Sequence, residues 1–333
     1  MSTREYKFDN IRFILIFLVV MGHLLEITVG FGTNSLLYRV IYLFHMPAFM
    51  FLSGYFAKFN KCKICNLMVI YIIFQIIYCT YDFFFVNYDP CKKIQFQFTT
   101  PYWLLWYILV LIFYYLLIPL FDSDSRSVKF TNFIVVTIIS LLVNFDTTIG
   151  YYLSLSRLFS FLPYFILGYY IKKKETLTFS RPKHLLALLV MIVSVLFLWK
   201  TPQITSQVLY GSYSYHGADY NICTKLLLML IAYAYIYFIF NLPNINHKIP
   251  IITTLGQNTL SIFLLHGFII KALAKTNLLS LYPKYNLLIV ILLTIVILIL
   301  LGNTFVANKF SKLFTRNRIF FCGNQAINNK KNS

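Results

Sequence analysis

Four ionisable residues lie in one apolar stretch near the start of the chain, where charge is costly and function is the usual reason for it. Asp9, Arg12, His23 and Glu26 occur in DNIRFILIFLVVMGHLLE. Glu26 follows His23 by three residues, close enough on a helix to hydrogen-bond the imidazole. A neutral imidazole held by a carboxylate is a suitable general base near neutral pH. The pattern therefore predicts proton abstraction at His23.

The spacing of Arg12 and His23 predicts that both lie on one face of a helix. Eleven residues turn a helix by about 1100°, which is about 20° more than three full turns, and rise about 16.5 Å. We expect Arg12 at the cytoplasmic boundary and His23 near the middle of the membrane. The structural alternative is that Arg12 snorkels to lipid headgroups and His23 only forms a hydrogen bond between helices.

Two more histidines are expected at a middle depth in other apolar stretches. His45 lies in FHMPAFMFLSGYF, where Pro47 interrupts the helical hydrogen bonds, and His266 lies in LGQNTLSIFLLHG. We expect at least one of them within about 10 Å of His23, given helix packing distances of roughly 8 to 10 Å. Because the three histidines include no i,i+4 pair, we expect no metal site.

The elements that must position these residues are membrane helices. Hydrophobic residues make up 59% of the 333 residues and charged residues 12%, and the mean hydropathy is +0.72. A soluble domain has about twice that charged fraction. The net charge of +19 does not indicate nucleic-acid binding, because the cations separate apolar stretches instead of gathering on a polar face. We therefore predict an all-α, polytopic membrane protein with no nucleic-acid partner.

Ten apolar stretches are long enough to cross a hydrocarbon core of about 30 Å. If the N-terminus is inside, 20 of the 29 lysines and arginines fall on the cytoplasmic side. The sequence thus predicts a bundle of about ten transmembrane helices with both termini cytoplasmic, a membrane domain over 1–308 and a short basic cytoplasmic tail over 309–333. The predicted stretches are about 13–29, 38–56, 67–86, 103–121, 130–145, 151–171, 185–199, 222–242, 255–274 and 286–306.

Five sequence blocks resemble the acyltransferase-3 family of integral membrane acyltransferases, which includes bacterial fucose-4-O-acetylase-like and polysaccharide O-acetyltransferases. The opening block, YKFDNIRFILIFLVVMGH, carries the family's arginine, ten intervening residues and histidine, at Arg12 and His23. Four further blocks follow in the family's order: FHMPAFMFLSGYF, PYWLLWYILVLIFYYLL, SRLFSFLPYFILGYYI and LGQNTLSIFLLH.

This resemblance implies an O-acyltransferase in a bacterial plasma or inner membrane. The expected reaction moves an acyl group, usually acetyl, from cytoplasmic acetyl-CoA to a hydroxyl of a surface or exported polysaccharide or of a lipid-linked sugar. Acetyl-CoA is then a co-substrate, and we expect no bound cofactor. His23 either removes the proton of the acceptor hydroxyl or accepts the acyl group itself, with Arg12 and Glu26 assisting. Donor binding is assigned to four cations suited to the phosphates of CoA: Arg12, Lys58, Lys61 and Lys63.

Acceptor binding is assigned to Arg157, Trp106, His45 and His266. Arg157 lies in the outer half of an apolar stretch, so it either faces a cavity or snorkels to headgroups. Trp106 either belongs to the aromatic belt at the membrane surface or stacks on a sugar ring.

A transporter or flippase for a polyprenyl-linked sugar is the alternative function, because such a protein also lines a central cavity with charged residues. Transporters often carry inverted repeats and two interrupted helices in matching positions. The sequence shows neither feature, so we favour the acyltransferase.

Overall fold

Helices make up the regular structure of this chain. The computed structural model describes residues 6–28, 35–87, 94–172, 180–216, 220–243, 245–276, 279 and 285–315, and these residues include no β-strand. The α-helices are α1 (Tyr6–Glu26), α2 (Leu36–Tyr55), α3 (Lys61–Tyr81), α4 (Trp106–Phe121), α5 (Arg126–Leu142), α6 (Leu155–Lys172), α7 (Arg181–Lys200), α8 (Ser206–Leu209), α9 (Ile222–Phe240), α10 (Pro250–Gln257), α11 (Thr259–Ala274), α12 (Asn286–Gly302) and α13 (Thr304–Thr315).

The described residues contain seven helices that are long and apolar enough to cross a membrane singly, and nine if each of two bent pairs is one span. α6 is not among them, and its 18 residues include Arg157 and Lys172. Its position nevertheless matches the predicted stretch 151–171. The prediction of a polytopic helical membrane protein is confirmed, whereas the side on which each terminus lies stays a prediction.

Two of the predicted stretches are broken helices rather than continuous spans. Stretch 255–274 corresponds to α10 and α11, which meet at an angle of 80°, and stretch 286–306 corresponds to α12 and α13, which meet at 53°. The two breaks support each other, because Asn258 donates from Nδ2 to the Gly302 carbonyl at 2.7 Å. Both breaks fall at short polar segments, GQNT at 256–259 and GNT at 302–304, which lie close to one end of each predicted stretch. α13 also crosses the predicted boundary between 308 and 309; the part of the tail from 316 to 333 lies outside the described residues.

The first helix is displaced from its predicted position. α1 begins at Tyr6 instead of about residue 13, and it ends at Glu26 instead of residue 29. At 1.5 Å per residue, His23 lies about 25 Å from the start of α1 and about 4.5 Å from its end. His23 is therefore in the last turn of α1, and its depth in the membrane stays a prediction.

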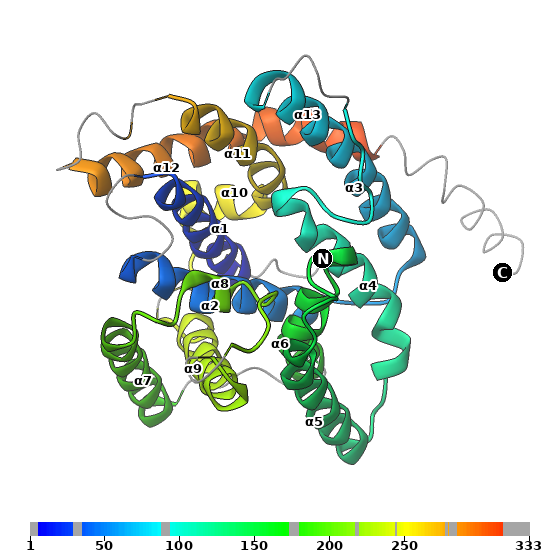
Figure 1. The fold of residues 1–333 in the computed structure, drawn as a ribbon, viewed down its shortest axis with the longest axis vertical. Coiled ribbons are helices and arrows are strands. Elements are labelled where there is room, and N and C mark those ends of the chain that lie inside the picture. Colours follow the sequence, from blue (N-terminus) through cyan, green and yellow to red (C-terminus); the bar gives the residue numbers. More distant parts are fainter. Residues whose placement is uncertain are drawn as a thin grey trace, which may run out of the picture.

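The central part of the bundle is built around α1 and α2. α11, α12, α13 and α3 lie on one side of them, and α5, α6, α7 and α9 lie on the other (Figure 1). α2 and α6 pack at backbone contact: a Cβ atom at Gly54 would lie 1.9 Å from the Phe165 carbonyl oxygen, and one at Gly168 would lie 2.1 Å from that of Phe51. Small residues allow such close helix packing in membranes, so the second half of α2 is fixed against α6.

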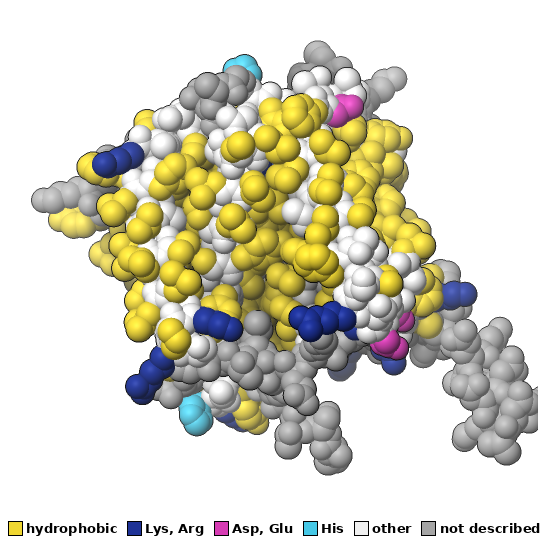
Figure 2. Space-filling view, turned by 90° about the horizontal axis from the view of Figure 1, so that it is seen from below, with side chains coloured by type: hydrophobic (Ala, Val, Ile, Leu, Met, Phe, Trp, Pro, Cys, Tyr) yellow, Lys and Arg dark blue, Asp and Glu magenta, His cyan; other side chains and the backbone are white. Residues whose placement is uncertain are grey.

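The outer helices present an apolar surface. In the most apolar 18-residue segment of each helix, 67% of the residues are buried in α1 and in α2, compared with 17% in α7. Figure 2 shows the result as a broad hydrophobic band, with most of the visible lysine and arginine side chains along its lower edge. A band of this kind, bordered by cations, is typical of a surface in contact with lipid. The large apolar residues that α7 exposes are Leu185, Leu186, Leu188, Leu189, Ile192, Val193, Leu196 and Trp199.

Candidate functional site

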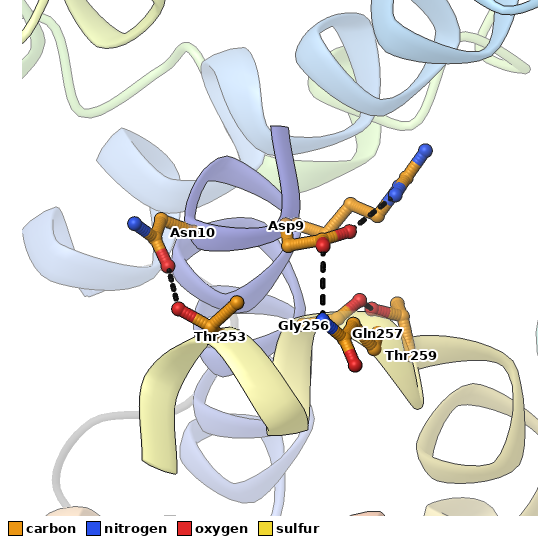
Figure 3. A network of polar contacts seen from close by, with 7 residues as sticks. Asp9, Asn10, Thr253, Gly256, Gln257 and Thr259 are labelled. Carbon is orange, nitrogen blue, oxygen red and sulfur yellow. Dashed lines mark hydrogen bonds and ion pairs between the residues drawn. The ribbon is translucent and has the colours of Figure 1, made fainter. Parts of the chain in front are cut away.

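The first turns of α1 carry polar side chains that are bound by a segment distant in sequence. Asn10, 1% exposed, donates from Nδ2 to the carbonyl oxygens of Ile245 (2.8 Å) and His247 (2.9 Å) and accepts from Thr253 Oγ1 (2.8 Å). Gln257 Nε2 donates to Asp9 Oδ2 at 3.2 Å (Figure 3). These bonds satisfy buried polar groups that would otherwise be costly, so they join α10 to the start of α1.

Arg12 completes this polar cluster and faces a cavity. Its Nη1 forms an ion pair with Asp9 Oδ1 at 2.8 Å, and its guanidinium lies 4.7 Å from the ring centroid of Phe56. Its side chain remains 30% exposed, whereas that of Asp9 is 3% exposed. Arg12 is therefore held in place from one side while its free donors remain accessible from the other.

The cavity that Arg12 lines, which we call the Arg12 cavity, has a volume of about 330 Å³. Lys63 also lines it and bonds Tyr115, whereas the exposed Lys58 and Lys61 do not line it. Of the four predicted donor-binding cations, the structure thus brings Arg12 and Lys63 to one cavity. Its lining comprises Arg12, Met46, Phe49, Leu52, Ser53, Phe56, Lys63, Leu67, Tyr107, Ile108, Leu111, Tyr115, Gly256, Gln257, Thr259, Leu260 and Phe263.

His23 lies at the other end of α1, between a carboxylate and two aromatic rings. Its Nδ1 lies 3.3 Å from Glu26 Oε2, as the i,i+3 spacing predicts, and 3.2 Å from the Tyr42 hydroxyl. The Trp103 ring centroid lies 4.6 Å from that of His23. Trp103 has a φ of +36°, an unusual backbone conformation for a bulky residue and one that is often found at functional sites. With Nδ1 engaged, Nε2 is the ring nitrogen that remains for chemistry.

His23 lines a second cavity, which we call the His23 cavity, with a volume of about 290 Å³. Arg157 faces it, with its guanidinium 4.8 Å from the Trp106 ring centroid and 5.1 Å from that of Tyr151. Arg157 Nε also donates to the Tyr210 carbonyl oxygen at 3.2 Å. The lining comprises His23, Glu26, Tyr42, His45, Met46, Pro101, Trp103, Leu104, Trp106, Tyr151, Arg157, Phe161, Leu209 and Tyr210.

The two other intramembrane histidines occupy different positions relative to this cavity. His45 lines it and is held by the Ile41 carbonyl oxygen, 2.7 Å from Nδ1. His266 is fully buried, does not line the cavity, and stacks on His23 with ring centroids 5.5 Å apart. The predicted distance between histidines is confirmed by this stack. His266 thus lies behind His23, outside the lining of this cavity, and its predicted acceptor-binding role stays a prediction.

Arg12 and His23 line separate cavities, although their spacing predicted a shared face of α1. The sequence also predicts one cavity through the membrane that passes His23 and is shared with Arg12; the structure instead places the two residues in the linings of two cavities, and a passage between these cavities stays a prediction. Arg12 opens into one cavity and His23 into the other, and Met46 of α2 lines both.

Sequence reasoning missed several residues of the site. Tyr42 and Tyr210 are tyrosines among 26 in the chain, and neither has a distinctive spacing relative to His23. Burial raises the pKa of Tyr210, whose hydroxyl lies 2.8 Å from that of Tyr38. Asn10 gives a weak signal, because it is a polar residue next to Asp9 in an apolar stretch. Among the residues that the structure describes, no three His, Cys, Asp or Glu side chains are grouped so as to hold a metal ion.

Comparison with known proteins identifies the family of this chain. A family model described as an acyltransferase domain, Acyl_transf_3, matches residues 5–306. Nodulation protein NolL of Sinorhizobium fredii (strain NBRC 101917 / NGR234) is 43% identical over 61 residues, which are 17% of each chain. NolL of Mesorhizobium japonicum is 42% identical over 61 residues, 17% of this chain and 16% of that protein.

The extent of these matches differs greatly. The matched segment of this chain spans about a sixth of the length of the two NolL proteins. No solved structure matches. The family model, in contrast, covers both cavities and all of the helices from α1 to α12. On this match, the chain belongs to the acyltransferase-3 family.

Proposed function

We propose that this protein is a membrane O-acyltransferase that moves an acetyl group from acetyl-CoA to a hydroxyl of a glycan or lipid-linked sugar. The observation that carries the proposal is the environment of His23. Glu26 and Tyr42 hold one ring nitrogen, and the other nitrogen is left for a cavity that Trp106 and Arg157 also line. An oriented histidine at a cavity with cationic and aromatic walls suits proton transfer from a sugar hydroxyl.

The Arg12 cavity is the proposed donor site. Its volume lies within the range of small-molecule sites, about 300 to 1,000 Å³. Arg12 and Lys63 supply positive charge for the phosphates of CoA, and Gln257 supplies an amide. The walls beyond them are apolar and include Phe49 and Leu111, which suits a pantetheine arm. Lys58 and Lys61 do not line this cavity and contribute to the local potential only.

The His23 cavity is the proposed acceptor site. Trp106 and Tyr151 present aromatic faces of the kind that stack on sugar rings. Arg157 lies over both rings, so its charge is available for a polar or phosphorylated acceptor next to a stacked ring. His45 contributes a further polar edge. His266 has a supporting role behind His23 in this proposal, rather than the acceptor-binding role that its sequence position suggested.

The chemistry follows from the tautomer that Glu26 favours. With Nδ1–H of His23 donating to Glu26, Nε2 carries the lone pair that accepts the hydroxyl proton. The acceptor oxygen then forms a bond to the thioester carbonyl carbon, and the carbon–sulfur bond breaks. The released thiolate takes the proton from Nε2, which yields CoA, the O-acyl ester and a neutral histidine. A covalent acyl-histidine route uses the same nitrogen as the nucleophile.

The direct test is release of free CoA by purified protein in proteoliposomes. We expect a free thiol to appear from acetyl-CoA at a rate that depends on an added glycolipid extract. His23→Ala should abolish this release while the protein remains folded. A wild-type protein that releases no CoA when acetyl-CoA and the glycolipid extract are both present would contradict the proposal.

A flippase for a polyprenyl-linked sugar is the second candidate, and the broken helices favour it. We expected no interrupted helices from the sequence, but α10–α11 and α12–α13 are both bent. Such breaks are common in transporters, where they occur at corresponding positions of two repeats. Here the two bent pairs are consecutive in the chain, which favours the acyltransferase. Movement of a fluorescent lipid-linked sugar across the vesicle without CoA release would reverse that preference.

A further inference from the structure

We propose that Met46 is the partition between the two cavities and limits the size of the acyl group that reaches His23. This inference rests on the proposed function, because it assigns the donor to the Arg12 cavity and the acceptor to the His23 cavity. Within the part of the chain that the structure describes, Met46 is the one residue that lines both. A donor thioester in the Arg12 cavity must therefore pass Met46 to meet an acceptor in the His23 cavity.

A wall of rings in mutual contact also runs from the Arg12 cavity to the His23 cavity. Phe263 lines the Arg12 cavity, and its ring centroid lies 5.3 Å from that of Tyr107 and 6.1 Å from that of His266. His266 in turn stacks on His23. Because His266 is fully buried behind His23, this wall is fixed by packing on its far side. The adaptable part of the boundary is then the methionine.

Methionine is suited to this position because its unbranched side chain has three rotatable bonds and adapts to irregular space. Met46 is half-buried, whereas its neighbours in α2, His45 and Pro47, are buried. Pro47 has no backbone N–H, so the hydrogen bond to the Leu43 carbonyl is missing next to Met46. A cavity of about 50 Å³ lies against Leu43 and Pro47. The helix therefore has local freedom at the partition and is fixed against α6 beyond it.

The size of Met46 has a direct consequence for donor choice. An acetyl group adds one methyl carbon to the carbonyl that must reach His23, whereas a hexanoyl group adds four further methylene carbons. Those carbons must occupy the space between Met46 and the ring wall while the carbonyl lies beside Nε2. A smaller side chain at position 46 should admit longer acyl groups, and a larger one should exclude even acetyl.

The first experiment compares donors in variants of position 46. We expect Met46→Ala to raise kcat/KM for hexanoyl-CoA relative to acetyl-CoA by at least about tenfold, since several methylenes at about 0.8 kcal/mol each gain room. Met46→Phe should lower acetyl transfer about tenfold or more, while the Kd for CoA stays within twofold of wild type. Met50→Ala is the matched control, because Met50 lies one turn further along α2, is fully buried and lines neither cavity. An unchanged donor preference in both Met46 variants would overturn the proposal.

The second experiment does not depend on activity. In a background with the native cysteines replaced by serine, Met46→Cys should react with a membrane-impermeant thiol reagent supplied from either side of the vesicle. Met50→Cys should react from neither side. Reaction of Met46→Cys from one side only, or from neither, would refute the partition even in an active protein. If wild type releases no CoA but Met46→Cys reacts from both sides, the proposed reaction fails and the partition stands.

Discussion

The two ends of α1 carry similar side chains in opposite situations. At one end, Asp9 is bound by Arg12 and Gln257 and Asn10 is bound by the 245–257 segment, so the polar groups of these two side chains already have partners. At the other end, His23 keeps one ring nitrogen for a cavity, and its neighbour Glu26 is 33% exposed. A polar residue in a membrane helix whose bonds are complete serves the fold, and we propose that His23, with one ring nitrogen left for a cavity, serves chemistry.

We call the end of α1 with His23 and Glu26 the open end. Replacing His23 tests this end and should produce the largest effect. We expect His23→Ala to lower kcat by about 100-fold or more, because a general base typically contributes 10² to 10⁴-fold. The measurement is CoA release per correctly inserted protein. His216→Ala is the control, since His216 is exposed and lies on a loop. Near-normal turnover in His23→Ala would show that both ends of α1 are structural.

We call the end of α1 with Asp9, Asn10 and Arg12 the closed end. Replacing Asn10 tests this end and should affect stability instead of turnover. Asn10→Ala removes two donated bonds and one accepted bond, including the buried bond to the Ile245 carbonyl oxygen. We expect a loss of about 1–3 kcal/mol in the free energy of unfolding, seen as a lower Tm in detergent. The exposed Asn308→Ala is the control. If Asn10→Ala kept its Tm and lost turnover, the assignment of the two ends would have to be exchanged.

Arg12 belongs to the closed end yet lines the donor cavity, so its replacement should affect binding more than chemistry. Arg12→Gln keeps a hydrogen-bond donor for Asp9 and removes the charge. We expect KM for acetyl-CoA to rise about tenfold, the lower part of the range for a hydrogen bond to a charged group, and KM for the acceptor to stay within twofold. Lys61→Ala, outside the cavity, should leave both KM values unchanged. An unchanged donor KM in Arg12→Gln would mean that Arg12 only anchors the helix.

Replacing Arg157 tests acceptor binding in the His23 cavity and should produce the smallest effect. Arg157→Gln removes the cation over Trp106 and Tyr151, and such contacts contribute about 0.5–2 kcal/mol. We expect KM for the acceptor to rise several-fold while KM for acetyl-CoA is unchanged. Initial rates at saturating acetyl-CoA measure this difference. A change in the KM for acetyl-CoA alone would mean that Arg157 binds the donor and not the acceptor.

Local pattern was enough to predict the helical class and one contact of the site. The apolar stretches predicted nearly every helix, and the i,i+3 spacing predicted that Glu26 contacts His23. The five ordered blocks led to the family. The position of Arg157 within an apolar stretch also indicated that its side chain could face a cavity. These features depend on a few neighbouring residues, and a single sequence contains that information.

The remaining features depend on partners that are distant in the chain. Asn10 bonds His247 and Thr253, and Asn258 bonds Gly302, and no local pattern specifies these pairs. The separation of Arg12 from His23 has the same cause. Helical spacing places both on one face of α1, but the packing of the other helices gives each its own cavity, with Met46 of α2 in both linings.

The bonds between α1 and the 245–257 segment have a consequence for biosynthesis. Asn10 emerges from the ribosome more than two hundred residues before Thr253, which at 5 to 20 residues per second is about 10 to 50 s. During that interval α1 enters the membrane with Asp9 and Asn10 lacking their later partners. We expect nascent chains that end before Pro250 to stay in crosslinking contact with the insertion machinery through α1, and chains that include Gln257 to be released. Asn10→Leu should remove this delay.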